Sequence, residues 1–130
     1  MWHQLDEVLR VAPDSVLEIG VGAGILGALV KSFGSEYRSV DIDPELQPDH
    51  VGSATALPFA DNSFDVVACY QVLEHLPYDA AVSSMQEIAR VARRRIVVSL
   101  PDAQPALRFA AYIPLIGRKR LLLGLPQLRI

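Results

Sequence analysis

Closely spaced glycines and two carboxylates in the first half of the chain could together bind a nucleotide-like ligand. Gly20, Gly22 and Gly24 follow a short apolar run and precede an amphipathic one. Glycines there allow a tight turn and a close approach of ligand to backbone, beside the free N–H groups of a helix N-terminus. Asp41, at the end of the next apolar run, could accept both hydroxyls of an adenosine ribose. The alternative is an ordinary tight turn and a surface acid.

Two classes of cofactor fit these glycines. The spacing of Gly22, Gly24 and Gly27 satisfies the dinucleotide fingerprint. Glu18, however, lies two residues before Gly20 inside the apolar run, where its carboxylate would repel a pyrophosphate. It suits a cofactor that carries an ammonium and a sulfonium, held directly or through water. Glu18 could instead pair with a lysine or arginine of the sheet.

Other reactive side chains are few. His75 follows an apolar run and could act as a general base if an acceptor must lose a proton, or it could simply hydrogen-bond a carboxylate or the backbone. Glu74 beside it lacks further spaced ligands, so we expect no metal site. Cys69 is the only cysteine and is expected to pack in the core.

Alternating strand and helix patterns must position these residues. Apolar periodicity predicts strands over 15–19, 37–42, 51–54, 64–69 and 94–100. Helices are predicted over 2–11, after the glycines up to a cap at Gly34, and over a segment that Asp79 could cap. This alternation is typical of a doubly wound, Rossmann-like α/β fold with a mostly parallel sheet of about five strands.

The chain has 130 residues and one cysteine, which suggest one domain and no disulfide framework. It shows neither a signal peptide nor a long apolar span, so a cytoplasmic location is expected. The net charge of −3 hides an asymmetry. Residues 1–89 carry fourteen acids and three bases, whereas residues 90–130 carry one acid and nine bases. Such a basic end can meet an anionic partner.

Four motifs together resemble the class I S-adenosylmethionine-dependent methyltransferases of the methyltransferase type 11 kind. They are VLEIGVGAG (16–24), SVDID (39–43), GSATALPFADNSFDVV (52–67) and VLEHL (72–76). The resemblance covers residues 15–100 and implies a doubly wound sheet with S-adenosyl-L-methionine bound along the strand tips. It implies methyl transfer to a small-molecule or lipid-like acceptor, with His75 as the candidate catalytic residue.

Carried over by position, the cofactor-binding residues fall into three groups. The glycine loop, with Glu18, Gly20, Val21, Gly22 and Gly24, would line the methionine part. Asp41 would bind the ribose hydroxyls, Ile42 would lie against the adenine, and Ser53 and Ala54 would contact the adenine edge. The residues after the fourth predicted strand, Cys69, Tyr70 and Gln71, would face the methionine group. The family usually has an aspartate where Ser53 stands, which predicts weaker adenine selectivity.

Residues 1–100 are thus interpreted as the cofactor-binding core and residues 101–130 as a basic, apolar tail of the same domain. The tail is short for the family and holds no clear hairpin, so the sheet is expected to be incomplete at its C-terminal edge. A homodimer or a partner chain could cover that edge, and the chain could be a non-catalytic remnant that needs such a partner. Arg118, Lys119 and Arg120 beside leucines could contact an anionic membrane, while nucleic acid is disfavoured for want of interleaved aromatic residues.

Overall fold

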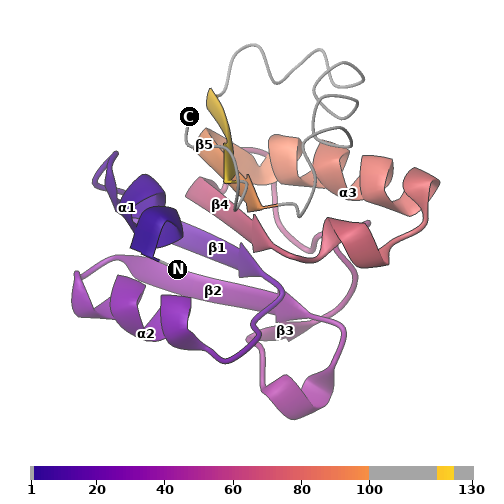
Figure 1. Ribbon diagram of the computed structural model, residues 1–130, viewed down its shortest axis with the longest axis horizontal. Coiled ribbons are helices and arrows are strands. Elements are labelled where there is room, and N and C mark those ends of the chain that lie inside the picture. The colour runs from indigo at the N-terminus through magenta and orange to yellow at the C-terminus, as the bar shows by residue number, and fades with distance from the viewer. Residues whose placement is uncertain (1, 100–119, 125–130) are drawn as a thin grey trace.

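The structure, a computed structural model, describes residues 2–99 and 120–124, with side chains from Leu5 to Ser99. Six strands form one sheet in the order β3-β2-β1-β4-β5-β6, and every pairing between them is parallel (Figure 1). The strands are β1 (Ser15–Ile19), β2 (Glu36–Asp41), β3 (His50–Val51), β4 (Phe64–Tyr70), β5 (Ala92–Ser99) and β6 (Arg120–Gly124). The predicted doubly wound, Rossmann-like fold is confirmed.

Helices cover both faces of this sheet. They are α1 (Trp2–Leu9), α2 (Ile25–Ser32) and α3 (Tyr78–Val91), with short 3-10 turns η1 (Pro44–Leu46) and η2 (Leu73–His75). α1 and α2 contribute to one buried cluster and α3 to another, so they lie on opposite faces. Successive strand residues point to opposite faces, which is why Val16 joins the α1/α2 cluster and Leu17 joins the α3 cluster.

Two features differ from the sequence-based expectation. A sixth strand, β6, pairs in parallel with β5 from Arg95↔Arg120 to Ser99↔Gly124. The sequence did not predict this strand because residues 121–124, LLLG, do not alternate between apolar and polar side chains as a half-buried strand does. Asp79 does not cap α3: Pro77 holds the N-cap position, and Asp79 lies in the first helical turn, where an acid still favours the helix dipole. Other boundaries differ by a few residues, such as β3 at His50–Val51 rather than 51–54.

The carboxyl ends of β1, β2 and β4 come together at one edge of the sheet (Figure 1). From β1 the chain runs outward to β2 and β3 on one side, then crosses back to β4 and runs outward to β5 on the other side. In doubly wound sheets, ligands bind in the crevice at such a switch point. The glycines, Asp41 and the segment after β4 all leave the sheet at this edge.

Candidate functional site

The glycine loop joins β1 to α2 in a conformation that needs glycine. Gly20, Gly22 and Gly24 all have positive φ, of 81°, 55° and 76°. A Cβ at Gly20 would collide with the Val72 side chain, because the loop packs against the segment after β4. At Gly22 and Gly24 a Cβ would meet nothing within 4 Å, so this stretch of backbone faces open space. The loop is therefore closed at its base and open where a ligand could approach.

Asp41 ends β2 and ties its strand to the glycine loop. Its Oδ2 accepts a hydrogen bond from the Val21 backbone N–H at 2.9 Å, and its Oδ1 accepts one from Asp43 at 2.9 Å. Each carboxylate oxygen has a second acceptor site. Asp41 is only half-buried and so keeps capacity for ligand hydroxyls while it fixes the loop.

Glu18 lies on the α1/α2 face of β1 and is 3% exposed. The Tyr37 hydroxyl donates to its Oε1 at 2.5 Å. Burial raises the pKa of Glu18 from 4.5 to about 7; the Tyr37 hydrogen bond opposes this rise and nearby Asp41 adds to it. An ammonium placed beside Glu18 would favour its charged form. The site thus holds a carboxylate that gains from a cationic ligand.

The predicted adenine contacts lie on exposed segments beyond β2 and β3. Ile42 is 72% exposed, and Val51 of β3 is 59% exposed. The Ser53 and Thr55 hydroxyls lie 2.8 Å apart and share a hydrogen bond, while the Thr55 N–H donates to Ser53 Oγ. Ala54 is buried in the α3-side core. Ile42 and Ser53 are therefore accessible to an adenine, whereas the Ala54 side chain serves packing.

The end of β4 and the segment after it bring fewer side chains to the site than the sequence suggested. The Cys69 side chain is fully buried in the α3-side cluster, and burial raises the pKa of its thiol to about 12. Tyr70 packs against the opposite cluster, the one that adjoins Glu18. Gln71 is exposed and has a positive φ of 56°. His75 closes η2 with a side chain 76% exposed, its Nε2 3.7 Å from Glu74 Oε1.

Several charged groups serve structure. Arg90 bonds Glu87, Asp61 and the carbonyls of Leu57 and Phe59. Arg93 pairs with Asp65 at 3.2 Å. Within the described residues, no group of three or more metal-binding side chains gathers and no helix is long and apolar enough to span a membrane. The expectation that no metal is needed stays a prediction, and the side chains of Arg118, Lys119 and Arg120 lie outside the described ones.

Sequence reasoning missed Tyr37 and the role of Gly27. Gly27, read as the third glycine of a dinucleotide fingerprint, lies inside α2 and faces the Tyr37 ring: a Cβ there would lie 2.7 Å from Tyr37 Cζ. A tyrosine at a buried strand position beside a glycine on the next helix is the signal that could have found this pair. Gly27 is thus explained by packing, without a pyrophosphate.

Comparisons with known proteins identify a family and a fold. Residues 17–98 match the methyltransferase domain family. A ubiquinone biosynthesis O-methyltransferase of Albidiferax ferrireducens is 28% identical over 94 residues, which cover 60% of this chain and 37% of that protein. The crystal structure of the PH0226 protein of Pyrococcus horikoshii superposes with a TM-score of 0.62 at 23% identity, covering 71% of this chain and 50% of that one.

A second similar structure contains a partner protein. It is a complex between the Haloferax volcanii Trm112 methyltransferase activator and a methyltransferase, 25% identical with a TM-score of 0.52, covering 62% of this chain and 41% of that one. The chain spans less than half the length of the curated relatives it matches. The family match itself covers well over half of the chain and includes the glycine loop, Asp41 and the segment after β4. The chain therefore belongs to the methyltransferase domain family.

Proposed function

We propose that this protein binds S-adenosyl-L-methionine and transfers its methyl group to a small-molecule or lipid-like acceptor. One observation carries the proposal: the buried Glu18 and the half-buried Asp41 flank an open glycine loop at the carboxyl edge of the sheet. Glu18 suits the ammonium of the methionine part, and Asp41 suits the ribose hydroxyls. Glu18 and Asp41 lie on neighbouring strands, so a single ligand that is cationic at one end and a nucleoside at the other could reach both.

The residues present fit this cofactor, which supplies an already activated sulfonium methyl. The protein then needs only to hold the cofactor, to orient the acceptor toward the methyl group and to exclude water. The open backbone at Gly22 and Gly24 permits close approach, and the bond from Val21 to Asp41 keeps loop and ribose site together. Ile42 offers apolar surface to the adenine, and Ser53 offers a hydroxyl.

His75 is the proposed general base for an acceptor that must lose a proton. It ends η2, directly after the β4 segment whose Val72 packs against Gly20. Its exposure lets it reach an acceptor from the open side, and Glu74 can orient its ring. An acceptor whose nucleophile carries no proton would not need His75.

Binding of NAD is the weaker alternative. A dinucleotide would set its pyrophosphate beside Glu18, and Gly27 is occupied in packing against Tyr37. Carboxylate and pyrophosphate would repel each other in a poorly solvated site. The geometry thus supports the sulfonium cofactor over the dinucleotide.

A second candidate function is cofactor binding by a subunit that needs a partner chain. One observation favours it: a similar solved structure, from Haloferax volcanii, holds a methyltransferase together with the Trm112 methyltransferase activator. We further propose that residues 1–100 form the cofactor-binding core and that residues 101–130 complete the same domain. The pairing of β6 with β5 supports the second statement.

Isothermal titration calorimetry with S-adenosyl-L-methionine tests the cofactor assignment, with NADH as the comparison ligand. We expect binding of the first, a loss of about tenfold or more in Glu18→Gln, and no binding of NADH. Arg38→Gln, an exposed change on β2, is the matched control. Tight NADH binding without S-adenosyl-L-methionine binding would reverse the assignment. Methyl transfer to a panel of phenols, amines and lipids, with His75→Ala compared, then addresses the acceptor.

A further inference from the structure

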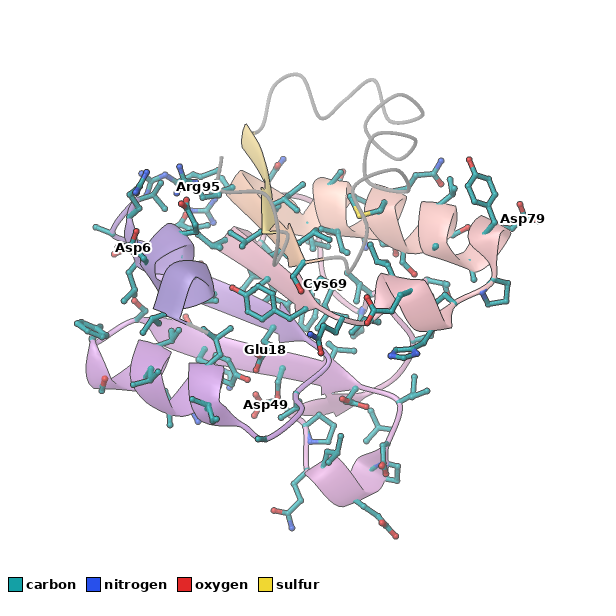
Figure 2. All side chains as sticks on the ribbon, in the orientation of Figure 1. Asp6, Glu18, Asp49, Cys69, Asp79 and Arg95 are labelled. Carbon is teal, nitrogen blue, oxygen red and sulfur yellow. The ribbon has the colours of Figure 1, made fainter. Side chains whose placement is uncertain are left out.

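Tyr37 is a buried polar residue that the cofactor signature does not include. It lies on β2, its hydroxyl donates to Glu18 Oε1, and its ring is 9% exposed. Figure 2 shows the labelled Glu18 over the central strands of the sheet, on the side of α2. A buried hydroxyl normally finds a partner. Here the partner is the very carboxylate that the proposed function assigns to the cofactor's ammonium.

The fold makes a specific space for this tyrosine. A Cβ at Gly27 would lie 2.7 Å from Tyr37 Cζ and 2.9 Å from its hydroxyl oxygen, so α2 carries a glycine where the ring passes. Gly27 does not have a positive φ, and its backbone therefore imposes no need for glycine. Lys31, one turn further along α2, places Nζ 5.2 Å from the ring centroid. Two elements, β1 through Glu18 and α2 through Gly27 and Lys31, thus contact this side chain of β2.

The neighbourhood favours a hydroxyl that stays protonated and keeps donating. Burial and the adjacent Glu18 raise the pKa of Tyr37. The residue opposite Glu18 in the β2 register is Ser39, whose N–H and hydroxyl both bond Asp49. The groups that bear on Glu18 electrostatically are Tyr37 and Asp41 from β2 and Cys69 and Tyr70 from β4, with Lys31 of α2 beyond the Tyr37 ring. Within the part of the chain that the structure describes, the Tyr37 hydrogen bond is the contact that favours the charged form of Glu18.

We propose that Tyr37, seated in the space left by Gly27, is a positioning residue for the amino-acid part of the cofactor. Its hydroxyl occupies Oε1 of Glu18, which leaves Oε2 to accept from an ammonium. This inference rests on the proposed function. Tyr37 itself touches the ligand nowhere in this scheme; it acts through Glu18.

The test compares two ligands that share the adenosine and the sulfur and differ in the amino acid. S-adenosylhomocysteine carries the ammonium, and 5′-methylthioadenosine does not. For Tyr37→Phe, which keeps the ring, we expect affinity for S-adenosylhomocysteine at pH 7 to fall by about tenfold and affinity for methylthioadenosine to stay unchanged. The pH at which S-adenosylhomocysteine binding reaches half its maximum should also move upward, because Glu18 loses the bond that favours its charged form. Tyr78→Phe, on the exposed start of α3, is the matched control.

A second variant reaches the same contact from α2. Gly27→Ala should displace the Tyr37 ring and reproduce the ligand-selective loss, and the double variant with Tyr37→Phe should lose no more than the larger single change. Equal affinity of wild type and Tyr37→Phe for S-adenosylhomocysteine would overturn the inference and leave the proposed function standing. Equal losses for both ligands would also overturn it, since they would mark a general structural defect. Absence of binding to wild type would instead sink the proposed function.

Discussion

The two faces of the sheet differ in what they bury. The face under α3 buries mostly apolar side chains, such as Leu17 of β1 and Met85 of α3, together with one thiol. Its helix also buries Ser84, whose hydroxyl donates to the Ala80 carbonyl within α3. The face under α1 and α2 buries Glu18, Ser39 and Arg95 as well as apolar residues. Burial of an ionisable group costs more than burial of a hydroxyl, so Glu18 and Arg95 place the larger cost on the α1/α2 side. The face under α3 therefore mainly stabilises the fold, whereas the face under α1 and α2 both stabilises the fold and positions Glu18 of the site.

The largest expected effect comes from a substitution in the apolar core under α3. Leu17→Ala removes a fully buried side chain from the middle of the α3-side cluster. We expect a loss of about 3 kcal/mol in the free energy of unfolding, measured by urea denaturation, from lost burial and the cavity left behind. Phe33→Ala, at a 65% exposed apolar position, should change little. A loss no larger than that of the control would mean that this face is not the stabilising one.

The second prediction concerns the face under α1 and α2. Here we expect a substitution to raise the free energy of unfolding, whereas Leu17→Ala lowers it. The folded-state pKa of Glu18, about 7, lies above the ordinary 4.5, so between these values the folded protein holds a proton that the unfolded chain releases. The contribution of Glu18 to stability therefore falls as pH rises from 4.5 to 7. Glu18→Gln should raise the free energy of unfolding by roughly 2 kcal/mol at pH 8 and by nothing below about pH 4.5, while it weakens cofactor binding.

Thermal unfolding of Glu18→Gln and wild type at pH 4.5 and 8 checks this difference. Glu36→Gln, an exposed glutamate on β2, is the control and should show no pH-dependent gain. If the variant is only as stable as wild type at pH 8, burial of Glu18 carries no cost. The two faces would then not differ in the cost of burying a charged group.

A third prediction concerns Arg90, whose polar contacts lie at the edge of the α3-side core. Arg90 donates to the Phe59 carbonyl at 2.7 Å and the Leu57 carbonyl at 3.1 Å, fastening the loop before β4 to α3. Arg90→Gln should cost about 1–2 kcal/mol and speed amide hydrogen exchange in residues 57–63. The exposed neighbour Arg94 supplies the control, Arg94→Gln. Unchanged exchange in that loop would remove Arg90 from this role.

The smallest expected effect tests the adenine end of the site. Ser53→Asp would replace a hydroxyl shared with Thr55 by a carboxylate, a stronger acceptor for an adenine amino group. We expect cofactor affinity to improve about threefold in calorimetry. Ser63→Asp, in the loop before β4, controls for added charge. Affinity that stays the same or falls would count against Ser53 as an adenine contact.

Local sequence patterns predicted where the site residues lie better than they predicted the contacts that hold those residues in place. Strand β1 was predicted over its observed bounds, and Gly20, Gly22, Gly24 and Asp41 meet at the expected edge because they follow parallel strands. The side-chain direction of Cys69 also follows from strand alternation, which is why its core packing could be expected. The roles in binding and catalysis assigned to these residues remain predictions.

The sequence by itself determined the order of the main helices and strands from α1 to β5, the glycine turn and the presence of a carboxylate where a pyrophosphate would be repelled. These features depend on local periodicity and residue type. Only the tertiary structure decided that Gly27 makes room for Tyr37, that Tyr37 bonds Glu18, and that Arg120–Gly124 joins the sheet as β6. Those contacts join α2 to β2, β2 to β1, and β5 to a segment some twenty residues further on. Contacts between separate elements are set by how faces pack, and no local period records them.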